Sequence, residues 1–258
     1  MDNSNKNTIL MPKRIVTYND DCLNTLKIIP DQSIDMILCD LPYGTTRNKW
    51  DCNIQLKPLW EQYERIIKTN GCIALFAQTP FDKVLGASNL KMLKYEWIWQ
   101  KQQGTGFLNA KKMPLKIHEN ILIFYNKPPI YNPQMRTGFK PYKCASGKGS
   151  SNYGSQVSVV TENDGERYPV DIITYPYDKQ KLHPTQKPVA LCEYLINTYT
   201  DENDLVLDNC MGSGSTGVAC VNTNRRFVGI EIEDKYYNIA NERILNQIRN
   251  NEVKENES

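Results

Sequence analysis

Short runs of apolar residues alternate with amphipathic segments of helical length along most of the chain. This alternation is typical of strands joined by crossover helices, and it predicts an α/β fold with a doubly wound, mostly parallel sheet. At 258 residues the chain is long enough to bury a sizeable core. Strands are expected at residues 14–18, 34–39, 72–77, 95–100, 120–125, 205–207 and 227–231, and helices at 21–29, 56–68, 80–90, 189–199, 216–223 and 235–247.

The pattern breaks down between residues 127 and 182, where Pro, Gly, Ser, Tyr and Lys are frequent. A stretch of this length without regular structure is usually functional or disordered. Residues 1–13 are polar and residues 251–258 are charged, so we expect both to be flexible tails. The chain therefore divides into a first α/β part at 14–126, an irregular insertion at 127–182 and a second α/β part at 183–250.

The net charge of +2 does not by itself indicate a polyanionic partner. The charges are unevenly distributed, because residues 101–187 contain 13 lysines and arginines against 6 acidic residues. This segment is expected to form a basic surface, which is either simply solvated or in contact with a polyanion.

The cysteines and apolar runs indicate the compartment. Eight cysteines form no C-x-x-C pair and only two histidines are present, so we expect reduced thiols and no metal site. No segment approaches the roughly 20 apolar residues of a membrane span. These features predict a soluble protein of the reducing cytoplasm with no membrane partner.

A strand, a glycine-rich turn and a helix are predicted within residues 206–217. Gly212, Gly214 and Gly217 fit the G-x-G-x-x-G pattern of nucleotide-binding turns. Asp208 at the strand end would oppose a pyrophosphate, but it suits a ligand that carries an ammonium and a sulfonium. The turn therefore favours S-adenosylmethionine over a dinucleotide, with a plain tight turn as the alternative.

Glu231 ends the next predicted strand, 23 residues after Asp208. A carboxylate at this position accepts hydrogen bonds from the ribose hydroxyls in nucleotide-binding α/β sheets. Both cofactors contain that ribose, so Glu231 supports a nucleoside cofactor without distinguishing between them.

The sequence Asp40-Leu41-Pro42-Tyr43 directly follows a buried strand, so it lies at the carboxyl edge of the sheet, where α/β proteins bind ligands. The exocyclic amine of adenine is a weak nucleophile because its lone pair is delocalised into the ring. Hydrogen bonds accepted by Asp40 and by the Leu41 carbonyl would free that lone pair. Tyr43 would stack on an extruded base, and Pro42 would stiffen the turn. The alternative is an acid that only caps a strand.

Three segments together resemble the amino-methyltransferases of DNA, in the permuted order of their beta class. Asp40-Leu41-Pro42-Tyr43 resembles the catalytic motif, His183-Pro184-Thr185-Gln186-Lys187-Pro188 resembles the segment before the cofactor motif, and residues 205–217 resemble the cofactor turn. The catalytic motif comes first here. The resemblance therefore implies a circularly permuted, seven-stranded methyltransferase sheet with a small irregular recognition insertion. It covers about 200 residues.

The resemblance also implies the site residues. The catalytic residues would be Asp40, Leu41, Pro42 and Tyr43. Asp21 matches the family acid that hydrogen-bonds the cofactor adenine. The full set expected to bind S-adenosylmethionine is Asp21, Cys22, Asp40, His183, Thr185, Gln186, Lys187, Asp208, Met211, Gly212, Ser213, Gly214, Thr216 and Glu231.

Two positions depart from the family pattern, and one position bears on the target base. Leu41 stands where the family usually has proline, and Asn209-Cys210 stand where it has Pro-Phe. An aspartate at position 40 is typical of enzymes acting on adenine N6, whereas relatives acting on cytosine N4 more often have serine. No Pro-Cys dipeptide is present, so the covalent route to cytosine C5 lacks its nucleophile.

Residues 127–182 occupy the position of the family's variable target-recognition region. Lysines would contact phosphates, and Arg136 and Arg167 are candidates for reading guanine edges. The expected DNA contacts are Lys101, Lys127, Arg136, Lys140, Lys143, Lys148, Arg167 and Lys179. The partner would be double-stranded DNA, and the resemblance adds a homodimer and a cognate restriction endonuclease.

Three alternatives to this DNA methyltransferase stay open from the sequence. One is a catalytically silent relative that binds cofactor and DNA, another is a nicotinamide-dependent oxidoreductase, and the third is a methyltransferase acting on RNA or protein.

Overall fold

The structure is a computed structural model, and it describes residues 8–12, 15–43, 54–145, 160–179 and 182–257. The chain divides into two compact units. The main unit consists of Met1–Asn132 and Asp171–Ser258, and the second unit consists of Pro133–Val170. Within the described residues, no helix combines the length and the apolar composition needed to cross a bilayer.

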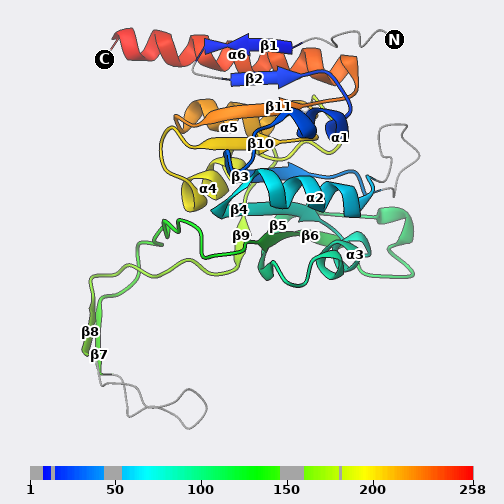
Figure 1. The fold of residues 1–258 in the computed structure, drawn as a ribbon. Coiled ribbons are helices and arrows are strands. Elements are labelled where there is room, and N and C mark those ends of the chain that lie inside the picture. Colours follow the sequence, from blue (N-terminus) through cyan, green and yellow to red (C-terminus); the bar gives the residue numbers. More distant parts are fainter. Residues whose placement is uncertain (1–7, 13–14, 44–53, 146–159, 180–181, 258) are drawn as a thin grey trace, which may run out of the picture. The chain divides into compact units, whose positions relative to one another are not determined.

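The main unit is built on a large sheet (Figure 1). Its strands are β1 (Thr8–Met11), β2 (Ile15–Tyr18), β3 (Ile34–Asp40), β4 (Ile67–Ala77), β5 (Leu93–Thr105), β6 (Lys116–Phe124), β9 (Ile172–Thr174), β10 (Leu205–Asp208) and β11 (Arg226–Ile230). They lie in the order β1-β2-β11-β10-β3-β4-β6-β5-β9. Neighbours run parallel except in the pairs β1 with β2, β4 with β6, and β5 with β6.

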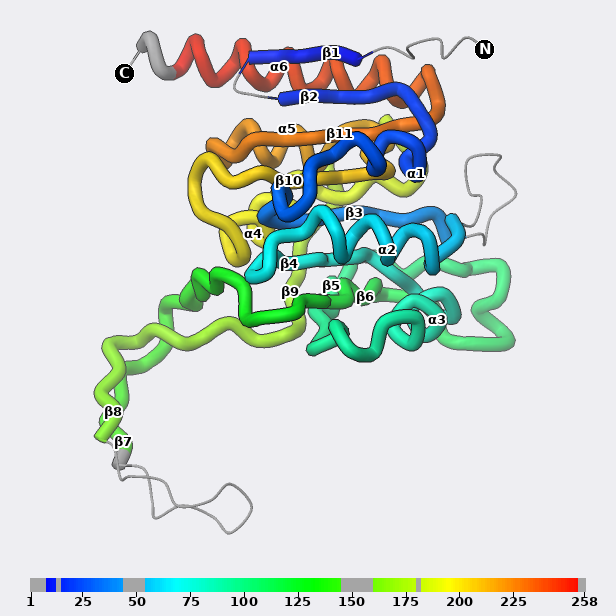
Figure 2. Tube along the Cα trace, viewed as in Figure 1, coloured from blue at the N-terminus to red at the C-terminus, as the bar shows by residue number. Residues whose placement is uncertain are grey.

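Helices cover both faces of this sheet (Figure 2). They are α1 (Cys22–Thr25), α2 (Leu56–Ile66), α3 (Phe81–Ser88), α4 (Val189–Tyr199), α5 (Ser215–Asn222) and α6 (Asp234–Glu257), with the 3-10 turns η2 (Leu26–Ile28) and η3 (Phe107–Asn109). Because side chains alternate along a strand, Met36 and Leu38 of β3 pack on the side of α4, α5 and α6, whereas Ile37 and Cys39 pack on the side of α1, α2 and α3. The doubly wound α/β fold is therefore confirmed.

The seven predicted strands form the middle of the sheet, and the structure adds one strand at each edge. β1 pairs antiparallel with β2, so residues 8–11 are a strand rather than part of a flexible tail. β9 pairs parallel with β5 through residues 172–174, inside the segment expected to be irregular. At the other end α6 continues to Glu257, which corrects the prediction of a flexible tail at 251–258.

The early and late parts of the chain meet in the centre of the sheet, where β10 pairs parallel with β3. From this central pair the chain moves outward in opposite directions, from β10 to β11 on one side and from β3 to β4 on the other. In open α/β sheets such a reversal of strand order leaves a crevice at the carboxyl ends of the strands. Asp40 and Asp208 are the last residues of these two strands.

The second unit contains a two-stranded antiparallel ribbon, β7 (Tyr142–Ala145) with β8 (Val160–Asn163). Outside the ribbon, Arg136 and Arg167 form a backbone bridge, in which each N–H donates to the other residue's carbonyl at 2.8 Å. The unit is shorter than the insertion predicted at 127–182, because the residues just outside 133–170 belong to the main unit.

Candidate active site

A cavity of about 660 Å³ opens at the carboxyl ends of β3 and β10. Most residues predicted to form the site line it, including those of the Asp-Leu-Pro-Tyr turn and of the glycine turn. The predicted residues in its wall are Asp21, Cys22, Asp40, Leu41, Pro42, Tyr43, His183, Thr185, Gln186, Lys187, Asp208, Met211, Gly212, Ser213, Thr216 and Glu231. The structure thus brings three distant segments of the sequence to one cavity.

The glycine turn needs two of its glycines for backbone conformation and one for packing. Gly212 and Gly214 have φ angles of +50° and +78°, which side-chain-bearing residues rarely adopt. Gly214 is the residue before α5, and it does not line the cavity. A Cβ on Gly217 would lie 2.4 Å from Ile244 Cδ1, so this glycine lets α5 approach α6 closely. The first two glycines shape the turn, and the third positions the helix behind it.

Glu231 holds the glycine turn against the end of β11. Its Oε2 accepts a hydrogen bond of 2.9 Å from Gly212 N, and its Oε1 accepts one of 2.9 Å from Glu233 N. Each oxygen keeps a second lone pair, so the carboxylate can still accept from two hydroxyls. Burial raises the pKa of Glu231, and these backbone donors oppose the rise. The geometry suits the ribose of a nucleoside cofactor.

Asp208 is buried beside the same turn. Its Oδ2 accepts from Thr216 Oγ1 at 2.7 Å and its Oδ1 accepts from Cys210 N at 3.1 Å. Burial raises the pKa of Asp208 to about 7, although the hydrogen bonds from Thr216 and Cys210 oppose the rise. A cationic ligand in the cavity would favour the ionised form, whereas a pyrophosphate would be repelled.

Four buried or partly buried charges alternate in sign along the opposite wall. Lys187 Nζ lies 2.5 Å from Asp40 Oδ2 and 3.2 Å from Glu119 Oε2, and Lys101 pairs with the other oxygen of Glu119. Tyr43 Oη donates a hydrogen bond of 2.6 Å to Asp40 Oδ1. Both oxygens of Asp40 are therefore held, which fixes the plane of its carboxyl group.

We call Asp40, Lys187, Glu119 and Lys101 the charge chain. Its two acids differ in pKa. Burial raises the pKa of Asp40; Lys187 opposes the rise, and the negative charge of Glu119 adds to it. Burial also acts to raise the pKa of Glu119, but Lys187 and Lys101 outweigh it and the pKa is lowered. Lys187 stays protonated because the two carboxylates overcome its own burial. Asp40 is thus the more basic acid of the pair.

Lys101 is corrected from a phosphate contact to a member of this buried chain. Only 5% of the residue is exposed, its ammonium pairs with Glu119, and it lies 5.4 Å from the centre of the Trp99 ring. Glu119 was not assigned a role from the sequence. The one signal for it is a charged residue at the start of the apolar strand that continues to Phe124, and such a residue is buried only when paired.

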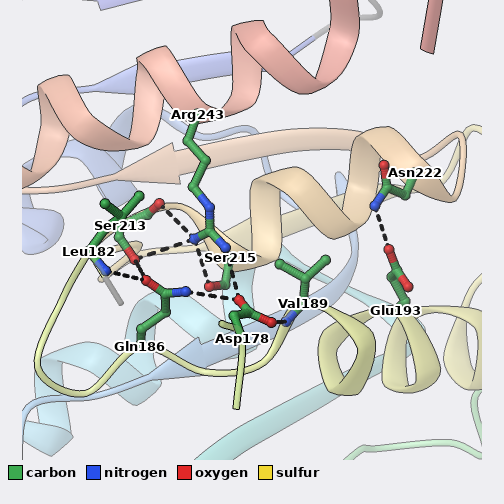
Figure 3. A network of polar contacts seen from close by, with 9 residues as sticks. All are labelled: Asp178, Leu182, Gln186, Val189, Glu193, Ser213, Ser215, Asn222 and Arg243. Carbon is green, nitrogen blue, oxygen red and sulfur yellow. Dashed lines mark hydrogen bonds and ion pairs between the residues drawn. The ribbon is translucent and has the colours of Figure 1, made fainter. Parts of the chain in front are cut away.

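The segment around Gln186 is tied to the glycine turn by a polar network (Figure 3). Gln186 Nε2 donates to Asp178 Oδ2 at 2.8 Å, and Gln186 Oε1 accepts from Leu182 N and from Ser213 Oγ at 2.9 and 3.3 Å. Arg243 of α6 reaches Asp178, Ser213 and Ser215 from the other side. Gln186 therefore links its own segment to Asp178 and to the glycine turn, and so fixes this part of the cavity wall.

His183 lies next to the glycine turn as a neutral ring. Its Nδ1 accepts a hydrogen bond of 3.2 Å from Thr185 N, and the ring centre is 4.2 Å from that of Tyr236. Burial, followed by the positive charges of Lys187 and Lys235, lowers the pKa of His183 to about 4. His183 is thus uncharged at neutral pH and supplies a neutral aromatic wall.

The other lysines predicted to contact DNA differ in exposure and in side-chain partners. Lys127, Lys140 and Lys179 are exposed, while Lys143 pairs with Glu162. Lys148 lies outside the described residues.

The two candidate guanine readers are partly engaged within the second unit. Arg136 donates from Nε to the Tyr168 carbonyl at 3.0 Å. Arg167 donates from Nη2 to the Lys140 carbonyl at 2.8 Å, and its guanidinium lies 4.5 Å from the centre of the Tyr142 ring.

The cavity wall fits S-adenosylmethionine. Asp208 and Glu231 line the cavity beside the glycine turn, whereas Arg243, which also contacts the turn, does not line it. This lining suits a ligand with a sulfonium and an ammonium, and Glu231 has lone pairs for ribose hydroxyls. The permuted doubly wound sheet, this cavity and the Asp-Leu-Pro-Tyr turn at its wall define a methyltransferase that acts on an amino group. The chain belongs to the DNA methylase family of N6 and N4 methyltransferases, whose model matches residues 34–242.

Named relatives agree with this family. The Type II methyltransferase M.HpaI of Haemophilus parainfluenzae is 29% identical over 248 residues, which cover 91% of this chain and 74% of the relative. The DNA adenine methyltransferase YhdJ of Escherichia coli K12 is 27% identical over 239 residues, covering 87% and 80% of the two chains.

Solved structures show the same fold. M1.HpyAVI in complex with S-adenosylmethionine superimposes with a TM-score of 0.62 at 25% identity, covering 88% of this chain and 98% of the other. The cytosine-N4-specific PvuII DNA methyltransferase gives a TM-score of 0.67 at 14% identity, covering 94% and 95%, so it supports the fold alone. The cofactor of the family, S-adenosylmethionine, is therefore also the cofactor of this chain.

We expect cofactor binding to strengthen as pH rises through about 7, because the ionised form of Asp208 attracts the cationic cofactor and its pKa lies there. Binding near pH 7 should release protons. Calorimetry in two buffers of different ionisation enthalpy measures that release.

Asp208→Asn should abolish the proton release, while Glu242→Gln on the exposed side of α6 should leave it intact. Proton release that persists in Asp208→Asn would show that another group is responsible.

Proposed function

We propose that this chain methylates adenine N6 in double-stranded DNA, with the target base turned out of the helix into the cavity. The observation that carries the proposal is the position of Asp40, whose carboxyl group lies in the cavity wall and is held there by Lys187 and Tyr43. The resemblance associates an aspartate at this position with adenine. The relative YhdJ is named as a DNA adenine methyltransferase, which supports the same target.

Bound S-adenosylmethionine supplies an electrophilic methyl group on its sulfonium. Asp40 prepares the acceptor, because each of its oxygens retains a lone pair that can accept an N–H of the target amine. Accepting that hydrogen bond draws the nitrogen lone pair out of conjugation with the ring. As the new N–C bond forms, the S–C bond to the methyl group breaks and its electron pair stays on sulfur, so the amine must lose one proton. Asp40 is placed to take that proton, since its pKa is raised by burial.

The wall near Asp40 provides aromatic surface for a flipped base. The Tyr43 ring lies 5.3 Å from that of Phe81, which fixes its tilt, and Trp99 and Tyr177 contact edge to face at 5.3 Å. All but Phe81 line the cavity. Stacking on such rings contributes about 1 to 3 kcal/mol per base in single-strand binding proteins, enough to offset part of the cost of extrusion.

The second unit is proposed to recognise the target sequence. It carries Arg136, Lys140, Lys143 and Arg167, and its β7–β8 ribbon has the two-stranded form that fits a major groove. A cognate restriction endonuclease is part of the same proposal, supported by relatives that are named Type II methyltransferases. A homodimer is also proposed, from the family resemblance alone. We also propose a cytoplasmic location, since the six cysteines in the described part of the main unit are thiols rather than disulfides.

The direct test is methyl transfer to DNA that lacks its own modification. Purified protein and isotopically labelled cofactor should produce labelled N6-methyladenine, identified by mass spectrometry of the nucleosides, while RNA and protein stay unlabelled. Single-molecule sequencing of the product then gives the recognised site. Label in N4-methylcytosine would replace adenine by cytosine as the target, and no label in DNA would refute the proposal.

Asp40→Asn should reduce kcat about 100-fold or more, because the amide keeps the size of the side chain but loses the charge and the proton acceptor. Cofactor binding, measured by calorimetry, should persist and show that the variant is folded. A variant with nearly unchanged kcat would remove Asp40 from the mechanism.

The acid limb of the pH profile of kcat/KM should move in opposite directions when Glu119 and Lys187, the two charged neighbours of Asp40, are neutralised one at a time. Glu119 raises the pKa of Asp40 and Lys187 lowers it. Glu119→Gln should therefore move the acid limb of kcat/KM to lower pH, and Lys187→Gln should move it to higher pH. If both variants lose activity equally at every pH, the charge chain has only a structural role.

A further inference from the structure

The turn that joins β5 to β6 carries large apolar side chains that point into solvent. Every residue from Thr105 to His118 is exposed. Phe107 is 70% exposed and Leu108 fully exposed, at 101%, and Met113 follows at 55%. We call residues 105–117 the hairpin tip. A pair of adjacent exposed apolar residues on a turn calls for an explanation, because nothing in folding favours it.

The hairpin tip is held in one shape by its own backbone. Gly106 has a φ of +91° and opens the 3-10 turn η3. Asn109 N donates to the Gly106 carbonyl at 2.9 Å, and Lys112 N donates to the Asn109 carbonyl at 2.8 Å. Below the turn, a Cβ on Gly104 would lie 2.9 Å from Leu115 Cβ, so the two strands are in close contact. Phe107 and Leu108 are therefore presented on a preformed support.

The charge of the hairpin tip indicates its partner. Residues 105–117 contain three lysines, Lys111, Lys112 and Lys116, and no acidic residue. Lys116 donates to the Thr79 carbonyl at 3.0 Å, which leaves Lys111 and Lys112 as the pair beside the apolar residues. A second copy of the same tip would bring like charges together. An anionic partner with an apolar interior satisfies both features.

The hairpin tip is continuous with the wall of the cavity. Lys101 and Thr105 of β5 both line the cavity, and the tip begins at Thr105. Between the pairs Gln100 with His118 and Thr105 with Lys116, β5 has four residues and β6 has one, so β5 bulges just before the tip. Lys101 lies on the buried face of β5 because it alternates with Trp97 and Trp99. Figure 1 shows the turn after β5, in green at the right, at the end of the sheet toward which the arrow of β3 points.

We propose that the hairpin tip is a DNA wedge, in which Phe107 and Leu108 enter the base stack where the target base has left and Lys111 and Lys112 contact the adjacent phosphates. This inference rests on the proposed function. Apolar side chains inserted between base steps unstack and kink a duplex, at a cost of a few kcal/mol per step. An inserted wedge fills the gap left by extrusion and keeps the base from returning.

The test uses the double variant Phe107→Ser/Leu108→Ser with duplexes that carry the site found by sequencing. One duplex has the target correctly paired, and the other has it opposite an abasic position, where extrusion costs less. We expect kcat/KM to fall about 10- to 100-fold on the paired duplex and much less on the abasic one, with unchanged cofactor affinity. Val84→Ser, at an exposed apolar residue of α3, is the matched control and should change neither.

The lysines are tested separately through salt. Lys111→Gln/Lys112→Gln should reduce the slope of log affinity for duplex against log salt concentration by about 1.8, or 0.9 for each phosphate contact.

An equal loss on both duplexes, or no loss on either, overturns the wedge while the proposed function stands. If the wild-type chain binds duplex but transfers no methyl group, the proposed function fails and the wedge is decided by affinity alone. The serine variant should then lose affinity for the paired duplex selectively. If Phe107→Ser/Leu108→Ser instead abolishes self-association or binding to anionic lipid vesicles and leaves both DNA readouts unchanged, the tip serves that other partner.

Discussion

Val206 and Leu207 of β10 pair with Met36 and Ile37 of β3 in parallel register, and the site depends on this pairing. It is reinforced by Asp35 of β3, whose Oδ2 accepts a hydrogen bond of 2.9 Å from Leu205 N across a separation of 170 residues. Because the two strands are parallel neighbours, their last residues, Asp40 and Asp208, reach the same edge. In the proposed function, the turn after Asp208 holds the cofactor and the turn that begins at Asp40 holds the amine.

Asp208 and Asp40 differ in the groups that surround their carboxylates. Among the described residues, Asp208 has no cationic hydrogen-bond partner and accepts from Thr216 and Cys210, so a cationic ligand would favour its ionised form. Asp40 is paired with Lys187 and stays within a chain of alternating charges. Buried ion pairs contribute little net stability because desolvation offsets attraction, so their benefit here is orientation. The site combines a ligand-sensitive acid with a fixed one.

The sequence predicted the elements whose pattern is long or buried on both faces. The structure places α4 at the predicted 189–199, and β3 differs from its prediction by one residue. β1 and β9 were missed because strands of three or four residues at a sheet edge have too few positions for a pattern to show. Their pairing depends on β2 and β5 being already in place.

The motif residues were located from the sequence, but their partners were not. Asp40 and Lys187 belong to motifs, whereas Glu119 and Lys101 are single charges. Lys101 shares the buried face of β5 with Trp99, and Glu119 lies opposite Trp99 on β6. The sequence alone does not distinguish a lysine on a basic surface from a lysine that is buried against a carboxylate. Local patterns carry no information on which of these applies, because the answer depends on long-range pairing.

The boundaries of the second unit have a consequence for how such enzymes diversify. Asn132 is anchored by its N–H to the Thr198 carbonyl at 2.8 Å, and the Asp171 carbonyl accepts from Ile98 N at 2.7 Å. The two residues that flank Pro133–Val170 are thus held by α4 and β5 within the main unit. With the recognition role proposed for this unit, the stretch between them can change in length and composition while the main unit keeps its site, so a new target sequence would require exchange of this segment alone.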